Sequence, residues 1–164
     1  MPFTIAATGH RPPKLGGYST PNLALERAAL SAIVALQPDR VISGMALGWD
    51  QEIALAAMQY EIPVIAAVPF REQPQRWPSS SQVRYYSILR RCEHVEYVST
   101  NAEPLKAMQL RNIWMVDNAQ LMAALWNGSA GGTANCIRYA QRQHVPIRNF
   151  WEKFEQMREN AEII

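Results

Sequence analysis

Apolar residues fall into two alternating patterns along the chain. Short apolar runs closed by glycine, proline or polar residues predict buried strands, and apolar residues recurring every three to four positions predict helices. In the segment 22–36, Leu25, Ala29, Ile33 and Leu36 recur at helical spacing after Asn22, a residue type that caps helices. The patterns predict strands at 3–8, 39–44, 62–70, 94–99, 120–126 and 145–151, and helices at 22–36, 49–60, about 82–91, 104–119, 131–144 and 151–162.

Strands that alternate with helices are joined by crossover connections, which place parallel strands in one sheet with helices on both faces. The run 62–70 is apolar almost without interruption, as expected of a strand covered on both faces. The sequence therefore predicts an α/β fold, a Rossmann-like three-layer sandwich with a mostly parallel sheet. We expect a single domain over 1–164, with a core at about 3–148 and a C-terminal helix at 151–162, because no linker interrupts the pattern.

Composition and charge narrow the class of protein. The net charge of +2 is far smaller than that of a dedicated nucleic-acid binder, so the charge does not favour a nucleic-acid partner. Cys92 and Cys136 offer neither a disulfide framework nor zinc-ligand spacing, and we expect no metal and no cofactor. No signal peptide or membrane-length apolar run is present, which indicates a cytoplasmic protein without a membrane partner. A homo-oligomer is expected, with the apolar helix at 105–119 as a possible interface.

Glycine-rich turns follow three of the predicted strands. In parallel sheets ligands bind beyond the carboxyl ends of the strands, where glycine exposes backbone N–H groups and the next helix N-terminus attracts an anion. A single glycine often serves only the turn, but three such turns in one small domain favour a phosphate or nucleotide site. The stretch "GSAGGT" lacks the lysine of a P-loop, and no G-x-G-x-x-G follows the first strand. The candidate ligand-binding residues in these turns are Gly9, His10, Arg11, Ser43, Gly44, Met45, Gly48, Gly131, Gly132 and Thr133.

Four stretches together resemble a known family: "TGHRPPKLGGY", "ISGMALGWDQEIALAA", "VPFREQPQRW" and "RNIWMVDNAQLMAALWNGSAGGT". Over about residues 3–148 they resemble the YpsA-like branch of the SLOG superfamily. That superfamily also contains the lysine-decarboxylase-like phosphoribohydrolases and the DNA-processing protein A fold. The resemblance implies a Rossmann-like fold with a nucleotide-derived ligand at the Gly44 turn and at the turn Gly131-Gly132-Thr133. It also places Asn112 and Asp117 in the "RN…VD" motif.

The chain departs from the phosphoribohydrolases at one position. Those enzymes carry a glutamate three residues after the threonine of their glycine–threonine motif, and here Cys136 stands three residues after Thr133. Their catalytic pair therefore does not carry over directly. Asp50 and Glu52 are candidate replacements, because breaking an N-glycosidic bond needs a carboxylate near the anomeric carbon and a second group to manage the water. The alternative is that both acids only complement the dipole of their helix.

The remaining candidates have alternatives of their own. Arg11 suits a phosphate or carboxylate clamp that Lys14 would assist, but both are equally consistent with solvated side chains. Asp117 could cap the end of its helix and have no role in binding a ligand. Segment 71–91 is rich in arginine and aromatic residues, which would suit a lid that stacks Phe70 or Trp77 on a base, packing against the domain, or single-stranded nucleic acid.

We therefore expect a nucleotide or nucleoside-phosphate ligand at the C-terminal edge of the sheet. The protein would act either as a sensor or binding protein, or as a phosphoribohydrolase-like N-glycosidase that uses Asp50 or Glu52. The alternatives are a module that binds or processes single-stranded DNA and a non-catalytic protein-interaction domain.

Overall fold

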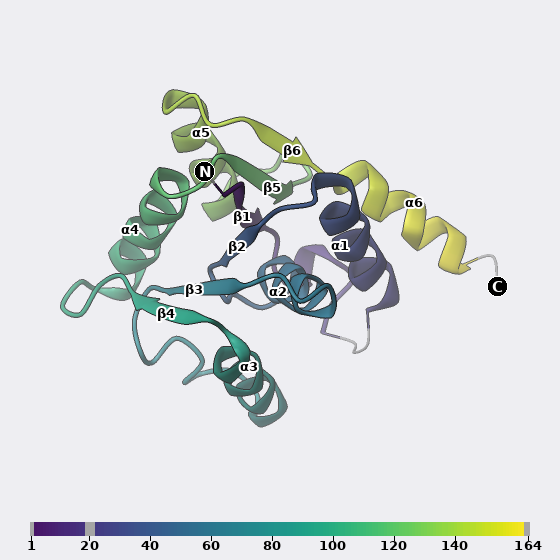
Figure 1. Cartoon of the computed structure of the whole chain (residues 1–164). Helices are drawn as coiled ribbons and strands as arrows, with labels where there is room; N and C mark the ends of the chain where they lie inside the picture. Colours follow the sequence, from purple (N-terminus) through teal and green to yellow (C-terminus); the bar gives the residue numbers. More distant parts are fainter. Residues whose placement is uncertain (1, 19–21, 163–164) are drawn as a thin grey trace.

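The computed structural model describes residues 2–18 and 22–162, and within these ranges it contains one six-stranded sheet. The strand order is β4-β3-β2-β1-β5-β6, and each neighbouring pair is parallel (Figure 1). The predicted α/β fold is therefore confirmed. The strands are β1 (Thr4–Gly9), β2 (Arg40–Ser43), β3 (Val64–Val68), β4 (His94–Tyr97), β5 (Leu121–Leu125) and β6 (Ile147–Asn149).

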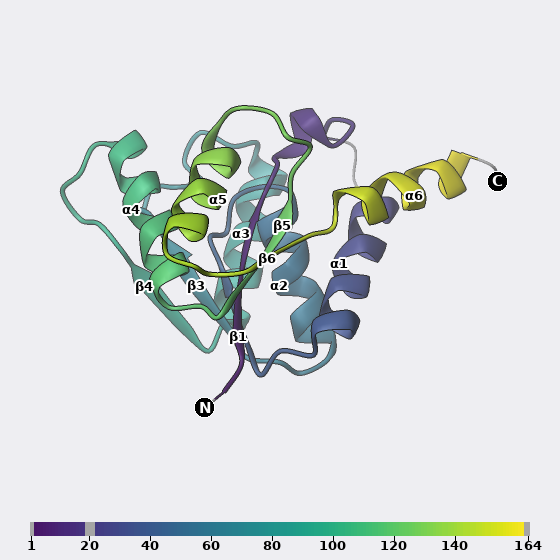
Figure 2. The ribbon, with the colours of Figure 1, turned by 90° about the horizontal axis from the view of Figure 1, so that it is seen from above.

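Helices cover both faces of the sheet. Helices α4 and α5 lie on one side, and α1, α2 and α6 lie on the other (Figure 2). Asn22 caps α1 as predicted, since its side chain accepts a hydrogen bond from the backbone N–H of Leu25 at 3.1 Å. The helices are η1 (Pro12–Lys14), α1 (Leu23–Leu36), α2 (Trp49–Gln59), α3 (Ser79–Arg91), α4 (Pro104–Asp117), α5 (Gly132–Arg142) and α6 (Trp151–Glu162).

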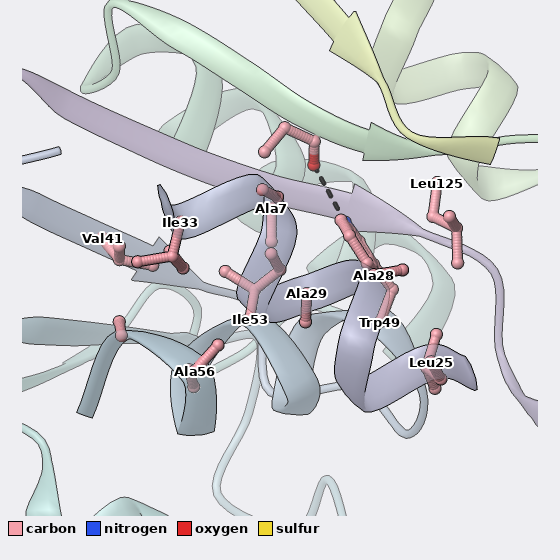
Figure 3. Packing of buried hydrophobic residues seen from close by; sticks show 14 of the residues in the cluster. Ala7, Leu25, Ala28, Ala29, Ile33, Val41, Trp49, Ile53, Ala56 and Leu125 are labelled. Atoms are coloured by element: carbon pink, nitrogen blue, oxygen red, sulfur yellow. Dashed lines mark hydrogen bonds between the residues drawn. The ribbon is translucent and has the colours of Figure 1, made fainter. Parts of the chain in front are cut away.

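Side chains of successive strand residues alternate between two cores. Ile5 and Ala7 of β1 pack towards α1 and α2, whereas Ala6 packs with residues of α4 and α5. Trp49 is completely buried in the first core, and its indole Nε1 donates a hydrogen bond to the carbonyl oxygen of Ala123 at 3.0 Å (Figure 3). This bond fixes the start of α2 against the sheet.

The strand order determines where a ligand can bind. Strands β2, β3 and β4 lie in that order on one side of β1, and β5 and β6 lie on its other side. The turns after β1 and β5 therefore lead to helices on opposite faces of the sheet. A crevice between them at the carboxyl ends of the strands is the usual ligand site of such folds.

Candidate ligand-binding site

A cavity of about 630 Å³ occupies the crevice after β1 and β5. The turn 9–14 forms one wall, α4 forms another, and the N-terminus of α5 forms a third. Its volume lies within the range of small-molecule sites. The predicted residues that line it are Gly9, His10, Arg11, Asp50, Asn112, Gly131, Gly132 and Thr133, and Lys14 lines it as well.

One end of the cavity is the first turn of α5. Gly131 precedes this helix with φ of 141°, a conformation that side-chain-bearing residues rarely adopt, and no side chain caps the helix. The backbone N–H groups of the first turn are thus free to receive an anion. Lys14 adds a positive charge here, and its Nζ donates to Ser129 Oγ at 2.8 Å. The turn after β1 is thereby tied to the turn after β5.

His10 lies where β1 ends and is buried. Its Nε2 atom is 2.8 Å from Oδ1 of Asn127, and its ring meets Trp151 edge-on with 5.8 Å between the ring centroids. Burial lowers the pKa of His10 below its usual value. A neutral imidazole at pH 7 therefore joins the first turn to the β5 turn and to α6.

Asp50 and Arg111 form the charged floor of the cavity, and both are at least 95% buried. Burial raises the pKa of Asp50 to about 6, against the opposing effect of the Arg111 and Arg11 guanidinium groups. Burial also lowers the pKa of Arg111. Arg111 donates through Nη1 to the carbonyl oxygen of Gly44 and through Nε to Oδ1 of Asn112 at 2.9 Å. Its Nη2 has no hydrogen-bond partner among the described residues and remains available to a ligand.

Gly44, in the turn after β2, lies close to both charged side chains of the floor. A Cβ on Gly44 would lie 2.7 Å from Arg111 Nη1 and 2.8 Å from Asp50 Oδ2, so a side chain here would displace both charged groups. The Gly44 carbonyl oxygen also accepts a hydrogen bond from Gln73 Nε2 at 3.0 Å. The glycine after β2 is therefore needed for close approach of charged side chains.

Ser43 and Met45 lie beneath the floor and do not line the cavity. Ser43 Oγ donates to the carbonyl oxygen of Asp50 at 2.7 Å and accepts from the backbone N–H of Met45 at 3.2 Å. Met45 has φ of 61°, a left-handed conformation that costs roughly 1–3 kcal/mol in a residue with a side chain. These contacts hold the start of α2, and Asp50 with it, in place.

Five other predicted site residues, Glu52, Gly48, Phe70, Trp77 and Asp117, do not line the cavity. Glu52 is ion-paired with Arg84 of α3, and it lines a separate cavity together with Gly48. Trp77 packs edge-on against Tyr85 with ring centroids 5.5 Å apart, and Asp117 accepts a hydrogen bond from the Tyr139 hydroxyl at 2.8 Å.

Segment 71–91 packs some of its aromatic side chains against the domain, although more than half of its residues are exposed. Tyr85 is 1% exposed, and Trp77 is partly buried against the same core. Phe70 is half-buried and lines neither cavity. The aromatic rings expected to stack on a base are thus mostly engaged within the fold.

Arg111 was not predicted from the sequence. It lies on the buried stripe of α4 between Ala107 and Met115, at the i, i+4 and i+8 positions. An arginine in the middle of a buried apolar stripe is a signal for a functional charge, since an arginine is seldom fully buried without a partner.

The cavity is electropositive. Among the described residues that line it, Arg11, Lys14 and Arg111 are cations, and Asp50 is the one aspartate or glutamate. Within 2–18 and 22–162, no three His, Cys, Asp or Glu side chains are grouped so that they could hold a metal ion. None of the helices described there is long and apolar enough to cross a membrane.

Comparison with known proteins agrees with this architecture. The model of the YspA SLOG family, YpsA, matches residues 5–150. The chain belongs to this family. It is 30% identical over 122 residues to the uncharacterized SPbeta prophage-derived protein YoqJ of Bacillus subtilis (strain 168), covering 65% of this chain and 71% of YoqJ. The family resemblance seen in the four sequence stretches is thus confirmed.

Two solved structures share the fold at low sequence identity. DNA processing protein A from Helicobacter pylori, described as binding single-stranded DNA, has a TM-score of 0.64 and 18% identity, covering 90% of this chain and 65% of its own. A molybdenum cofactor binding protein from the phototrophic bacterium Rippkaea orientalis has a TM-score of 0.56 and 16% identity, covering 91% and 76%. At these identities the likeness concerns the fold alone.

Proposed function

We propose that this SLOG protein binds a nucleotide or nucleoside phosphate in the cavity between the β1 and β5 turns. The observation that carries the proposal is the combination, in one cavity, of an uncapped helix N-terminus with three cations and a single buried carboxylate. The phosphate would bind the backbone N–H groups of Gly132 and Thr133, with Lys14 and Arg11 beside it. Asp50 would accept hydrogen bonds from the sugar hydroxyls.

Binding without turnover is the simpler form of this function. Hydrolysis by two carboxylates needs both near the anomeric carbon, and Glu52 lies in the other cavity with Arg84. A hydrolase that uses Asp50 alone is the second candidate. It is favoured by the pKa of Asp50, which at about 6 lets the carboxyl group hold and release a proton near neutral pH.

A single DNA strand is a weaker candidate ligand, although a protein of the same fold is described as binding one. Strand binding uses exposed aromatic rings on which bases stack, together with basic side chains. Here Tyr85 is buried and Arg84 is engaged with Glu52, whereas Tyr86, Arg76, Arg90 and Arg91 are exposed. The cavity with its uncapped helix N-terminus favours a small ligand over a strand.

Calorimetric titration with inorganic phosphate, nucleoside mono- and diphosphates and a short single strand of DNA tests the proposal. The informative variant is Gly132→Ala, because a Cβ at Gly132 meets no atom within 4 Å and would project into open space at the cavity wall. Alanine is also the better helix former, so the fold should keep its stability or gain up to about 1 kcal/mol. We expect nucleotide affinity to fall at least tenfold. Arg142→Ala, which removes a cation at the opposite end of α5, is the control and should bind normally.

Chromatography of each bound nucleotide after incubation separates the two forms of the function. Free base released by the wild type but not by Asp50→Asn would establish the hydrolase. Intact ligand would establish the binding protein. Nucleotide binding that is equally strong in Gly132→Ala, or tight binding of the DNA strand alone, would refute the proposed site.

A further inference from the structure

A second cavity, of about 290 Å³, lies beside the first and shares none of its lining residues. It is enclosed by η1, by the start of α1 and by the first turns of α2 and α3. The two cavities meet different residues of the same helical turn: Asp50 lines the larger one, and Gln51 and Glu52 line the smaller one. Its volume is at the low end of small-molecule sites, which start at roughly 300 Å³.

Unsatisfied polar atoms line the smaller cavity. Gln51 is 2% exposed, and its Nε2 donates to the carbonyl oxygen of Met45 at 3.2 Å. Its Oε1 accepts no hydrogen bond from the described residues, yet it is not sealed from solvent, so it is a free acceptor at the cavity wall. Water can satisfy this oxygen in the free protein, and an N–H donor of a ligand would replace that water.

Glu52 supplies a second acceptor. Its side chain is 9% exposed, and one carboxylate oxygen is paired with Arg84, while the other has no partner among the described residues. Arg84 is 33% exposed at the same wall, so further N–H groups of its guanidinium are available. Because Glu52 already neutralises Arg84, the pair does not favour an additional free anion.

The remaining wall is mixed. Leu15 and Leu25 are buried core residues, Leu47 and Pro78 add apolar surface, and Asn22, Ser80 and Ser81 add polar groups. A ligand here needs an apolar body and, on one edge, an N–H donor group for the free oxygens of Gln51 and Glu52 beside an acceptor for the Arg84 guanidinium. The amino group of 2-aminopurine beside its ring nitrogen and the ring N–H of hypoxanthine beside its carbonyl oxygen both offer this pair.

We infer that the smaller cavity binds a nucleobase-sized heterocycle, of the purine class, through Gln51 Oε1, the Glu52 carboxylate and Arg84. The site is distinct from the proposed phosphate site and does not depend on it. Because Asp50 directly precedes Gln51 in the first turn of α2, a base bound here would contact the turn that positions the floor of the larger cavity.

Fluorescence titration with free 2-aminopurine tests this inference, since the probe is excited outside the tryptophan band and its emission changes when it stacks in a protein site. We expect saturable binding that free guanine and hypoxanthine displace. Two variants address the site. Ser81→Trp fills the cavity from the first turn of α3, and Glu52→Gln keeps an acceptor for Arg84 but replaces the other acceptor by a donor. Both should weaken binding at least tenfold, and thermal unfolding of each variant verifies that it is folded.

Gly132→Ala is the matched control, because it alters the larger cavity only. Its 2-aminopurine affinity should equal that of the wild type even if nucleotide binding is lost. Absence of saturable binding at millimolar probe, unchanged binding in folded Ser81→Trp and Glu52→Gln, or binding lost in Gly132→Ala would each overturn the inference. The last result would place the base in the larger cavity and would leave the proposed nucleotide function intact.

Discussion

Replacing Asp50 by asparagine should make the ligand-free protein more stable at neutral pH. The carboxyl group is buried, and burial raises its pKa from 3.8 to about 6 although two arginines oppose the shift. The folded state therefore binds the proton more tightly than the unfolded chain does. By linkage, the free energy of unfolding falls as the pH rises from about 4 to about 6 and then stays constant.

The size of the effect follows from the shift. A rise from 3.8 to about 6 corresponds to about 3 kcal/mol of stability lost on ionisation. Asparagine resembles the protonated acid and keeps an acceptor for the hydrogen bond from the backbone of Ala46, so it avoids this cost. We expect Asp50→Asn to equal the wild type near pH 4 and to exceed it by up to about 3 kcal/mol at pH 7.

Urea unfolding of both proteins at pH 4 to 8 measures this difference. His10 and Glu52 also have shifted pKa values, but they are present in both proteins, so the difference between the two curves isolates Asp50. Asp117→Asn is the control for loss of one carboxylate at an exposed site. If Asp50→Asn is no more stable than the wild type at pH 7, or if the gap is the same at pH 4, the reasoning is wrong. A confirmed gain would mean that the fold carries Asp50 at a cost in stability, as expected of a functional group.

Two further substitutions test the packing around the site. Gly9→Ala should lower the free energy of unfolding by about 1–3 kcal/mol, because its Cβ would lie 2.5 to 2.7 Å from three carbons of the buried Trp49, and an unchanged urea midpoint would show that Trp49 can shift. Arg84→Ala should destabilise the protein at pH 7 by about 1–3 kcal/mol, because it leaves the buried Glu52 carboxylate unpaired. In this variant the pKa of Glu52, already raised by burial, should rise further. The loss of stability should therefore shrink as the pH falls below the pKa of Glu52, because the protonated carboxyl group needs no cation. A loss of equal size at pH 4 and pH 7 would show that the ion pair is not its cause.

Most of the elements could be predicted from the apolar pattern because the sheet is covered on both faces. The apolar pattern shows which residues are buried but not which residues pair in the sheet, and this explains the wrong bounds of two predicted elements. Of the predicted strand at 145–151 only Ile147–Asn149 is strand, and Phe150 and the partly buried Trp151 are apolar because they pack on the first core. Helix α3 starts at Ser79 rather than near Gln82, because Pro78 sets the start and three serines fill a first turn without an apolar repeat.

The position of the larger cavity could be predicted from the sequence, but part of its lining could not. Parallel strands bring the turns after β1 and β5 to one edge, so Gly9, Arg11 and the Gly131-Gly132-Thr133 turn could be grouped from the sequence. Asp50 and Glu52 do not face the same cavity, because residues two apart on a helix point about 160° away from each other around its axis. Helical geometry alone would have shown this. The place of Arg111 on the apolar stripe of α4 marks it as unusual, but its contact with the Gly44 turn depends on how α4 packs on the sheet, which no local pattern encodes.

The charges in the larger cavity point to a ligand with two different ends. Asp50 and Arg111 are both buried and both flank Gly44, yet no ion pair within 4.0 Å joins them among the described residues. Each charge therefore keeps unmet hydrogen-bonding capacity towards the cavity. Phosphate alone would satisfy the cations and leave the carboxylate unpaired, whereas a sugar phosphate would bring hydroxyl donors to Asp50 as well. A nucleoside monophosphate should accordingly bind more tightly than inorganic phosphate, and that advantage should be smaller in Asp50→Asn.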